Sequence, residues 1–185
     1  MNGFEYAMGL ISVLIGLALV DVAMSVHKLV RHCMTVRWDA RVILSASLVV
    51  LIIVRMWFAL WSIRDVAIVL YFPFYLSLFV EFMLLFLLAS SCLPDEPPAD
   101  CNLGQFYESN QRTLWTVFAV FQLSFYLHWL YFGGTDAPLQ THAAVLGPLA
   151  IYLSLVFLRS RAMHIVVPAL LIGWELYSGW SQSLT

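Results

Sequence analysis

The chain has 185 residues, of which 62% are apolar and 11% are charged, with a formal net charge of −2. Soluble domains typically contain roughly 45–50% apolar and about 25% charged residues, so a soluble core of this size would lack the polar surface to cover it. Lipid as the surrounding solvent removes that need. The sequence contains no basic tract for nucleic acid and no glycine-rich phosphate loop, which excludes two common classes of ligand.

Long apolar segments predict an all-α integral membrane bundle of six transmembrane helices that occupies residues 1–185 as a single domain with short loops. A helix of about twenty residues crosses a hydrocarbon layer roughly 30 Å thick. The segments that approach this length cover residues 6–26, 42–63, 66–90, 113–132, 143–158 and 164–181.

The first segment is expected to remain in the mature protein as a membrane helix. No basic residue precedes it, and its apolar run is longer than that of a cleaved signal peptide. Gly9, Gly16 and Ala23 recur every seven residues along one face. Small residues at this spacing predict a helix-packing seam that another helix can approach closely.

A polar stripe follows the same helix toward its C-terminal end. Asp21, Ser25, Lys28 and His32 follow one another at intervals of four, three and four residues, so they share one helical face. We expect this stripe to form a cytoplasmic vestibule, to which His164 at the start of the sixth segment also contributes.

The second and third segments each contain a charged residue within an apolar run. Arg55 lies in the stretch VVLIIVRMWFALW at 49–61, turned away from Trp57 and Trp61, so it is expected to face the bundle while the tryptophans meet lipid. Glu81 lies in the third segment. The short stretch SIRD at 62–65 predicts a tight turn that makes these two helices an antiparallel hairpin.

Two cysteines, Cys92 and Cys101, flank a proline-rich acidic loop at 93–100. They would form a disulfide in an oxidising compartment, but thiols stay reduced in the cytoplasm, where the basic residues place this loop. Their spacing matches no zinc pattern, so no metal site is expected.

The last three segments differ in regularity. The fourth ends at Gly133-Gly134, which is typical of a helix stop. The fifth contains Gly147-Pro148 and is expected to be short, and either kinked or re-entrant. The sixth is the least hydrophobic and carries Glu175, which shares a helical face with Ser178.

The basic residues predict the orientation, because the connections that carry them usually face the cytoplasm. On one side of the membrane, the predicted connections contain a single basic residue, Arg64. The other side holds Lys28, Arg31, Arg37, Arg41, Arg112, Arg159 and Arg161. Both termini are therefore expected outside the cytoplasm, in a plasma membrane of the bacterial inner-membrane type. Trp38 and Trp115 should lie near the inner interface.

Four ionisable residues fall inside predicted spans: Asp21, Arg55, Glu81 and Glu175. Each costs about 2.5–3.5 kcal/mol at a helix centre if nothing relieves its charge. At 1.5 Å per residue, Arg55 lies about 20 Å from the cytoplasmic end, Glu175 about 17 Å and Glu81 about 14 Å. Depth favours Glu175 as the partner of Arg55, whereas the hairpin favours Glu81, and both pairings stay open.

These acids lead to the hypothesis of a small channel or secondary transporter for protons or small cations. Glu175 and Glu81 would carry the ions and Arg55 would be their internal counter-ion. No hydrolase or metallopeptidase signature is present, so an enzyme is not expected.

Two alternatives remain. The chain could be a non-catalytic subunit or scaffold that forms an oligomer or joins a larger membrane complex through the seam of the first helix. It could also be a redox subunit that holds a haem between His27 and His164, or a quinone among its many aromatic side chains, although no cofactor is predicted as the first choice.

Overall fold

A computed structural model describes residues 3–31, 35–63, 71–98 and 100–180. Within these ranges the chain forms six α-helices and a π-helical turn, and no β-strand. The elements are α1 (Gly3–Arg31), α2 (Ala40–Ser62), α3 (Phe72–Ser91), α4 (Leu103–Trp129), η2 (Leu130–Gly134), α5 (Leu139–Phe157) and α6 (Met163–Gly179). The all-α prediction is confirmed.

Among the described helices, the five from α1 to α5 are long and apolar enough to cross a membrane. Helix α6 is apolar but has 17 residues, which gives it a length of about 26 Å against a hydrocarbon layer of roughly 30 Å. By length and composition these are the helices of a membrane-spanning protein.

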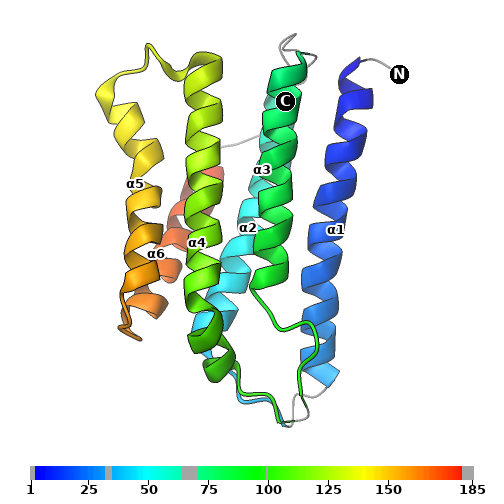
Figure 1. Cartoon of the computed structure of the whole chain (residues 1–185), viewed down its shortest axis with the longest axis vertical. Coiled ribbons are helices and arrows are strands. Elements are labelled where there is room, and N and C mark those ends of the chain that lie inside the picture. Colours follow the sequence, from blue (N-terminus) through cyan, green and yellow to red (C-terminus); the bar gives the residue numbers. More distant parts are fainter. Residues whose placement is uncertain (1–2, 32–34, 64–70, 99, 181–185) are drawn as a thin grey trace.

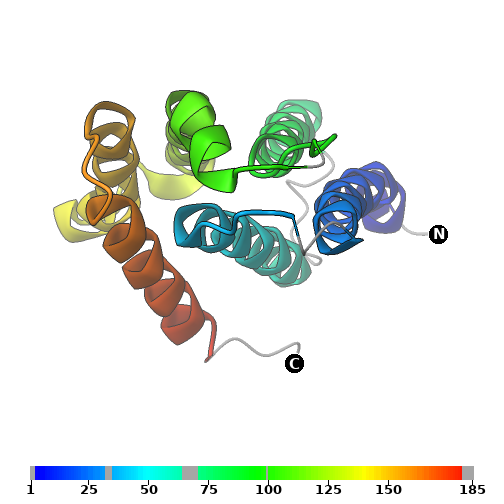
Figure 2. The same ribbon diagram turned by 90° about the horizontal axis from the view of Figure 1, so that it is seen from below.

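The helices alternate in direction and α2 lies at the centre of the arrangement. Seen along the bundle, α5, α4, α3 and α1 form a row, and α2 lies against this row with α6 inclined beside it (Figure 2). Helix α2 contacts α1, α3, α4 and α6. The start of α1 and the end of α6 lie toward the same end of the bundle (Figure 1).

Helix α3 ends well above the start of α4 (Figure 1). The side chain of Asn110 donates a hydrogen bond to the carbonyl of Ser91, so the last residue of α3 lies beside the third turn of α4. The chain then runs down along α1, where Lys28 Nζ donates to the carbonyl of Asp95 at 2.6 Å. The first turns of α4 therefore project beyond α3 at the lower end.

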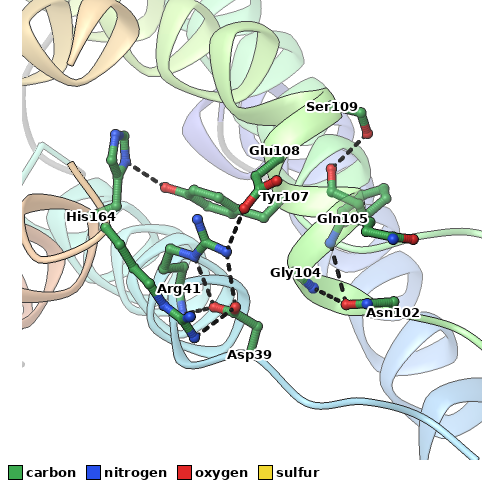
Figure 3. Close-up of polar contacts among 11 residues, drawn as sticks. Asp39, Arg41, Asn102, Gly104, Gln105, Tyr107, Glu108, Ser109 and His164 are labelled. Carbon is green, nitrogen blue, oxygen red and sulfur yellow. Dashed lines mark hydrogen bonds and ion pairs between the residues drawn. The ribbon is translucent and has the colours of Figure 1, made fainter. Parts of the chain in front are cut away.

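The connections that precede α2 and α4 are joined at this lower end. The backbone N–H of Arg37 donates to Cys101 at 2.9 Å, and that of Leu103 donates back to Arg37 at 3.1 Å. Asn102 then caps α4, because its side-chain oxygen accepts from the N–H of Gly104 at 3.0 Å (Figure 3). This link fixes the start of α4 relative to the start of α2.

Several helix limits differ from the predicted spans. Helix α3 begins at Phe72, with Pro73 in its first turn, where a missing N–H costs nothing. The predicted hairpin turn at 62–65 falls partly outside the described residues. Helix α4 begins ten residues before its predicted span because of the cap at Asn102. Helix α5 starts at Leu139 and continues through Pro148.

The prediction of an interfacial Trp115 is wrong. Its side chain is fully buried, its indole stacks on Phe118 with ring centroids 4.8 Å apart, and its Nε1 donates to the Tyr107 hydroxyl at 2.9 Å. The early start of α4 explains the difference, because it moves Trp115 from a helix end into the interior. Trp57 and Trp61 are both close to half exposed, as expected.

Cys92 and Cys101 are buried free thiols. Cys92 lies just after α3, and burial raises the pKa of its thiol to about 12. Burial also raises the pKa of the Cys101 thiol. Since the thiolate is the reactive species, both cysteines are protected in the folded protein at neutral pH.

This protection can be tested by thiol labelling of a Cys33→Ala variant in detergent micelles. At pH 7 we expect maleimide to label Cys92 at least tenfold more slowly in the folded protein than after denaturation, with peptide mass spectrometry as the readout. Labelling of Cys92 at equal rates in both states would contradict its burial.

Candidate functional site

In the described part of the chain, the charged residues within the bundle form three centres. In the first, Arg55 of α2 pairs with Glu175 of α6 through Nη1 and Oε2. The same Nη1 donates to the Ser178 hydroxyl at 2.7 Å. Of the two pairings left open by the sequence, the structure contains Arg55–Glu175, because α2 packs closely against α6.

A cavity of about 270 Å³ adjoins this ion pair, and its walls come from α2, α4, α5 and α6. Most of the lining is apolar and includes the aromatic rings of Phe121, Phe125 and Trp174. The polar residues of the lining are Arg55, Gln122, Tyr152 and Glu175. An apolar cavity with a few polar groups on its wall is the usual form of a small-molecule site.

The second centre surrounds Glu81, which is 1% exposed. His128 of α4 lies beside it, with Nδ1 at 3.2 Å from Glu81 Oε1. This contact is close enough for an ion pair but not aligned as a hydrogen bond, and Oε1 has no hydrogen-bond partner within the described part of the chain. A buried carboxyl oxygen in this condition is costly, which makes it a candidate for function.

The hydrogen bonds of Ser77 define the proton on His128. The Ser77 hydroxyl donates to the carbonyl of Phe74 at 2.8 Å, which uses its one proton. Ser77 Oγ must then accept from His128 Nδ1, 2.8 Å away, so Nδ1 carries a hydrogen. The same Nδ1–H also makes a second, weaker contact with Glu81 Oε1.

The sequence did not lead us to pair Glu81 with His128, since it placed His128 near the outer side and Glu81 about 14 Å from the inner one. That depth assumed that α3 ends at the inner surface. Because Ser91 lies beside Asn110 instead, Glu81 is farther from the lower end of the bundle than predicted and reaches the level of His128.

A buried ionic network closes the lower end of the bundle (Figure 3). Arg41 donates to both carboxylate oxygens of Asp39 at 3.0 Å, and to Glu108 of α4 at 3.2 Å. Arg161, in the connection between α5 and α6, adds a contact to Asp39 at 3.4 Å. Both Asp39 and Arg41 are buried, and Arg41 lies 5.0 Å from the Tyr107 ring centroid.

Asp39 has two functions here, since its side chain also caps α2 by accepting from the N–H of Arg41 at 2.8 Å. Hydrogen bonds from the Arg41 side chain hold the pKa of Asp39 below its usual range, although burial acts in the opposite direction. The motif WDAR at 38–41 contains the signal for this cap, an aspartate directly before an apolar helix. Sequence reasoning overlooked it.

His164, predicted to contribute to a vestibule, lies beside this network. Its Nδ1 is 2.7 Å from the Tyr107 hydroxyl, and its Nε2 is 2.9 Å from the carbonyl of Leu158. A carbonyl only accepts, so Nε2 carries the hydrogen and Nδ1 accepts from Tyr107. The side chain is 1% exposed.

The predicted stripe on α1 lies along the lower half of that helix in Figure 1. Ser25 is buried, whereas Asp21 and Lys28 are half-buried, so this face turns toward the rest of the protein. His32 lies outside the described residues. The structure does not bring Asp21 together with the Arg55 pair, because Arg55 bonds to Glu175 and Ser178 on α6.

The two histidines of the haem alternative are not brought together. His27 is exposed on α1, and α1 and α6 lie at opposite sides of the bundle in both views (Figures 1 and 2). Both ring nitrogens of His164 already have hydrogen-bond partners. Within the described ranges, no three His, Cys, Asp or Glu side chains form a group that could hold a metal ion.

The small-residue seam of α1 faces outward. Gly9, Gly16 and Ala23 are exposed, and nothing lies within 4 Å of the place where a Cβ would stand on either glycine. None of the described helices therefore packs into this seam.

No known protein family, characterised protein or solved structure matches the chain.

The ion pair between α2 and α6 can be tested with a double-mutant cycle. We expect Arg55→Met and Glu175→Met each to destabilise the protein, because each leaves the other charge uncompensated in an apolar setting. The double variant should recover part of the loss, with a coupling free energy of about 1–3 kcal/mol. Unfolding in mixed micelles measures all four proteins, and additive losses would show that the two side chains do not interact.

The lower network makes a second prediction. Asp39→Asn should lower the free energy of unfolding by about 3 kcal/mol, because Arg41 stays buried without its carboxylate. Glu108→Gln is the matched control and should cost less than about 1 kcal/mol, since the Glu108 side chain is 67% exposed.

The loss of stability caused by Asp39→Asn should depend on pH in one direction. The folded-state pKa of Asp39 is lowered, so its stabilisation is present above the unfolded value of about 4 and is lost as the pH falls through the folded value. The difference in stability between wild type and Asp39→Asn should shrink in acid. A difference that grows as the pH falls would contradict this assignment.

Proposed function

We propose that the chain is a small polytopic protein that moves protons across a membrane, with Glu81 as the proton-carrying carboxyl and His128 as its partner. The observation that supports this most directly is the buried, unpartnered Oε1 of Glu81, 3.2 Å from an imidazole nitrogen. Membrane proteins keep such costly groups mainly where they serve ion or proton pathways.

The chemistry of this centre favours protons over metal cations. Glu81 and His128 can hold one exchangeable proton in two arrangements, and the pair has no net charge in either. In the first, Glu81 is a neutral acid and the imidazole is neutral with its hydrogen on Nδ1. In the second, Glu81 is a carboxylate and the imidazolium carries the added proton on Nε2. A sodium or calcium ion would instead need several oxygen ligands, whereas the group that lies beside the Glu81 carboxyl is an imidazole.

The polar face of α1 is the proposed inner entrance. Helix α1 packs against α3, which carries Glu81, and the face with Asp21, Ser25 and Lys28 turns inward over the lower half of α1. A proton would leave Glu81 toward this face at the inner side, and would reach it from His128 toward the outer side.

The same proposal has α6 cross the membrane as a sixth span. The membrane is of the bacterial inner-membrane type, and both termini lie outside the cytoplasm. Pairing of Glu175 with Arg55 supports the sixth span, because it places α6 against the long helix α2 at the depth of Arg55. In this arrangement Arg55 and Glu175 form a neutral internal pair and leave Glu81 as the acid that exchanges protons.

Proton flux into liposomes that contain the purified protein tests the mechanism. Glu81→Gln should abolish the flux, because an amide cannot release a proton, while Glu96→Gln in the exposed acidic loop should leave it unchanged. A pH-sensitive dye inside the liposomes reports the rate, and circular dichroism verifies the fold.

Normal flux in Glu81→Gln would contradict the assigned role of Glu81. No flux in wild type would contradict proton movement itself. It would favour the second candidate, a scaffold that needs a membrane partner, which the outward-facing Gly9 and Gly16 support.

A further inference from the structure

The cavity beside Arg55 is lined by a largely buried tyrosine, Tyr152. Tyr152 is 4% exposed, and its ring packs on Phe118 and Trp115 at centroid distances of 5.0 and 6.0 Å. It lines the cavity, and within the described part of the chain its hydroxyl takes part in no hydrogen bond. The hydroxyl of a largely buried tyrosine usually has a partner, so this one is available to a ligand.

The cavity wall carries unused hydrogen-bond donors. Arg55 uses only Nη1 in its bonds to described residues, which leaves donors on Nε and Nη2. Tyr152 adds a hydroxyl. Glu175 already accepts from Arg55, and it cancels the charge of the guanidinium. A complementary ligand therefore offers acceptor oxygens and has no net charge.

The route into the cavity leads from the lipid side. Three of its lining residues, Ala59, Ala144 and Trp174, are exposed on the surface of the bundle. Arg55 lies fifteen residues into α2, about 22 Å along the helix and so within the hydrocarbon layer. An occupant that enters here is dissolved in the bilayer.

We propose that this cavity binds an uncharged, ring-bearing carbonyl compound from the bilayer, the chemistry of a quinone. Its carbonyl oxygens would accept from Tyr152 and from the free donors of Arg55, and its ring would pack among Phe121, Phe125 and Trp174. A cavity of about 150 Å³ takes a benzene ring, so the 270 Å³ here accommodate a substituted one. This site is separate from Glu81, and the proposal does not rest on proton movement.

Binding of a decyl-substituted benzoquinone to the protein in lipid nanodiscs tests the site, with empty nanodiscs as the background. Wild type should bind it saturably, and decylbenzene, which has the same tail on a six-membered ring without carbonyls, should bind at least tenfold more weakly. Tyr152→Phe keeps the ring and should raise the Kd about three- to tenfold, the effect of one lost hydrogen bond. Tyr177→Phe, on the exposed face of α6, should leave the Kd unchanged.

A second variant tests the cavity without changing the Tyr152 hydroxyl. Ala144→Leu narrows the cavity from its exposed side and should abolish saturable binding, while the thermal unfolding midpoint stays near that of wild type. Equal affinity for the quinone and for decylbenzene would overturn the proposal, as would wild-type affinity in both Tyr152→Phe and Ala144→Leu. Since the readout is binding, loss of proton flux in Glu81→Gln can neither produce nor hide these results.

Discussion

The carboxylate of Asp39 is the constraint on which the arrangement of the helices depends. It caps α2, binds Arg41 through both oxygens and accepts a further contact from Arg161, while Arg41 reaches Glu108 on α4. One buried acid thus connects the start of α2 with α4 and with the entry to α6. A buried pair of this kind contributes little net stability compared with apolar packing, but it tolerates few alternative arrangements, so it specifies the register of three elements.

The relative heights of the helices, fixed at the lower end of the bundle, determine which charged side chains meet in its interior. With the start of α2 held beside α4 and near the start of α6, Arg55 and Glu175 arrive at the same level and pair. The projection of α4 beyond α3 brings His128 to Glu81. The bundle therefore contains two acid centres with different character: a neutral ion pair beside a cavity, and a carboxyl with an unpartnered oxygen. We propose the first as the site of a lipid-soluble ligand and the second as the site of proton exchange.

Much of the helical architecture could be predicted from the apolar runs, because a lipid-embedded backbone must satisfy its hydrogen bonds internally and helices do so locally. Helix ends were less predictable. The early start of α4 depends on the cap at Asn102 and on its bridge to Arg37, a contact between distant segments. This error moved Trp115 to an interface in the prediction, whereas the structure buries it against Tyr107 and Phe118.

For the candidate sites, the residues to suspect could be found without the fold, since a charge in an apolar run is recognisable from its neighbours in the sequence. Arg55, Glu81 and Glu175 were identified in this way. Their partners could be assigned only from the packed helices, because pairing depends on the offset of whole helices, and an offset of two turns moves a side chain by about 11 Å. The same limit applies to Tyr152: its unpartnered hydroxyl becomes visible only when four helices enclose the cavity beside it.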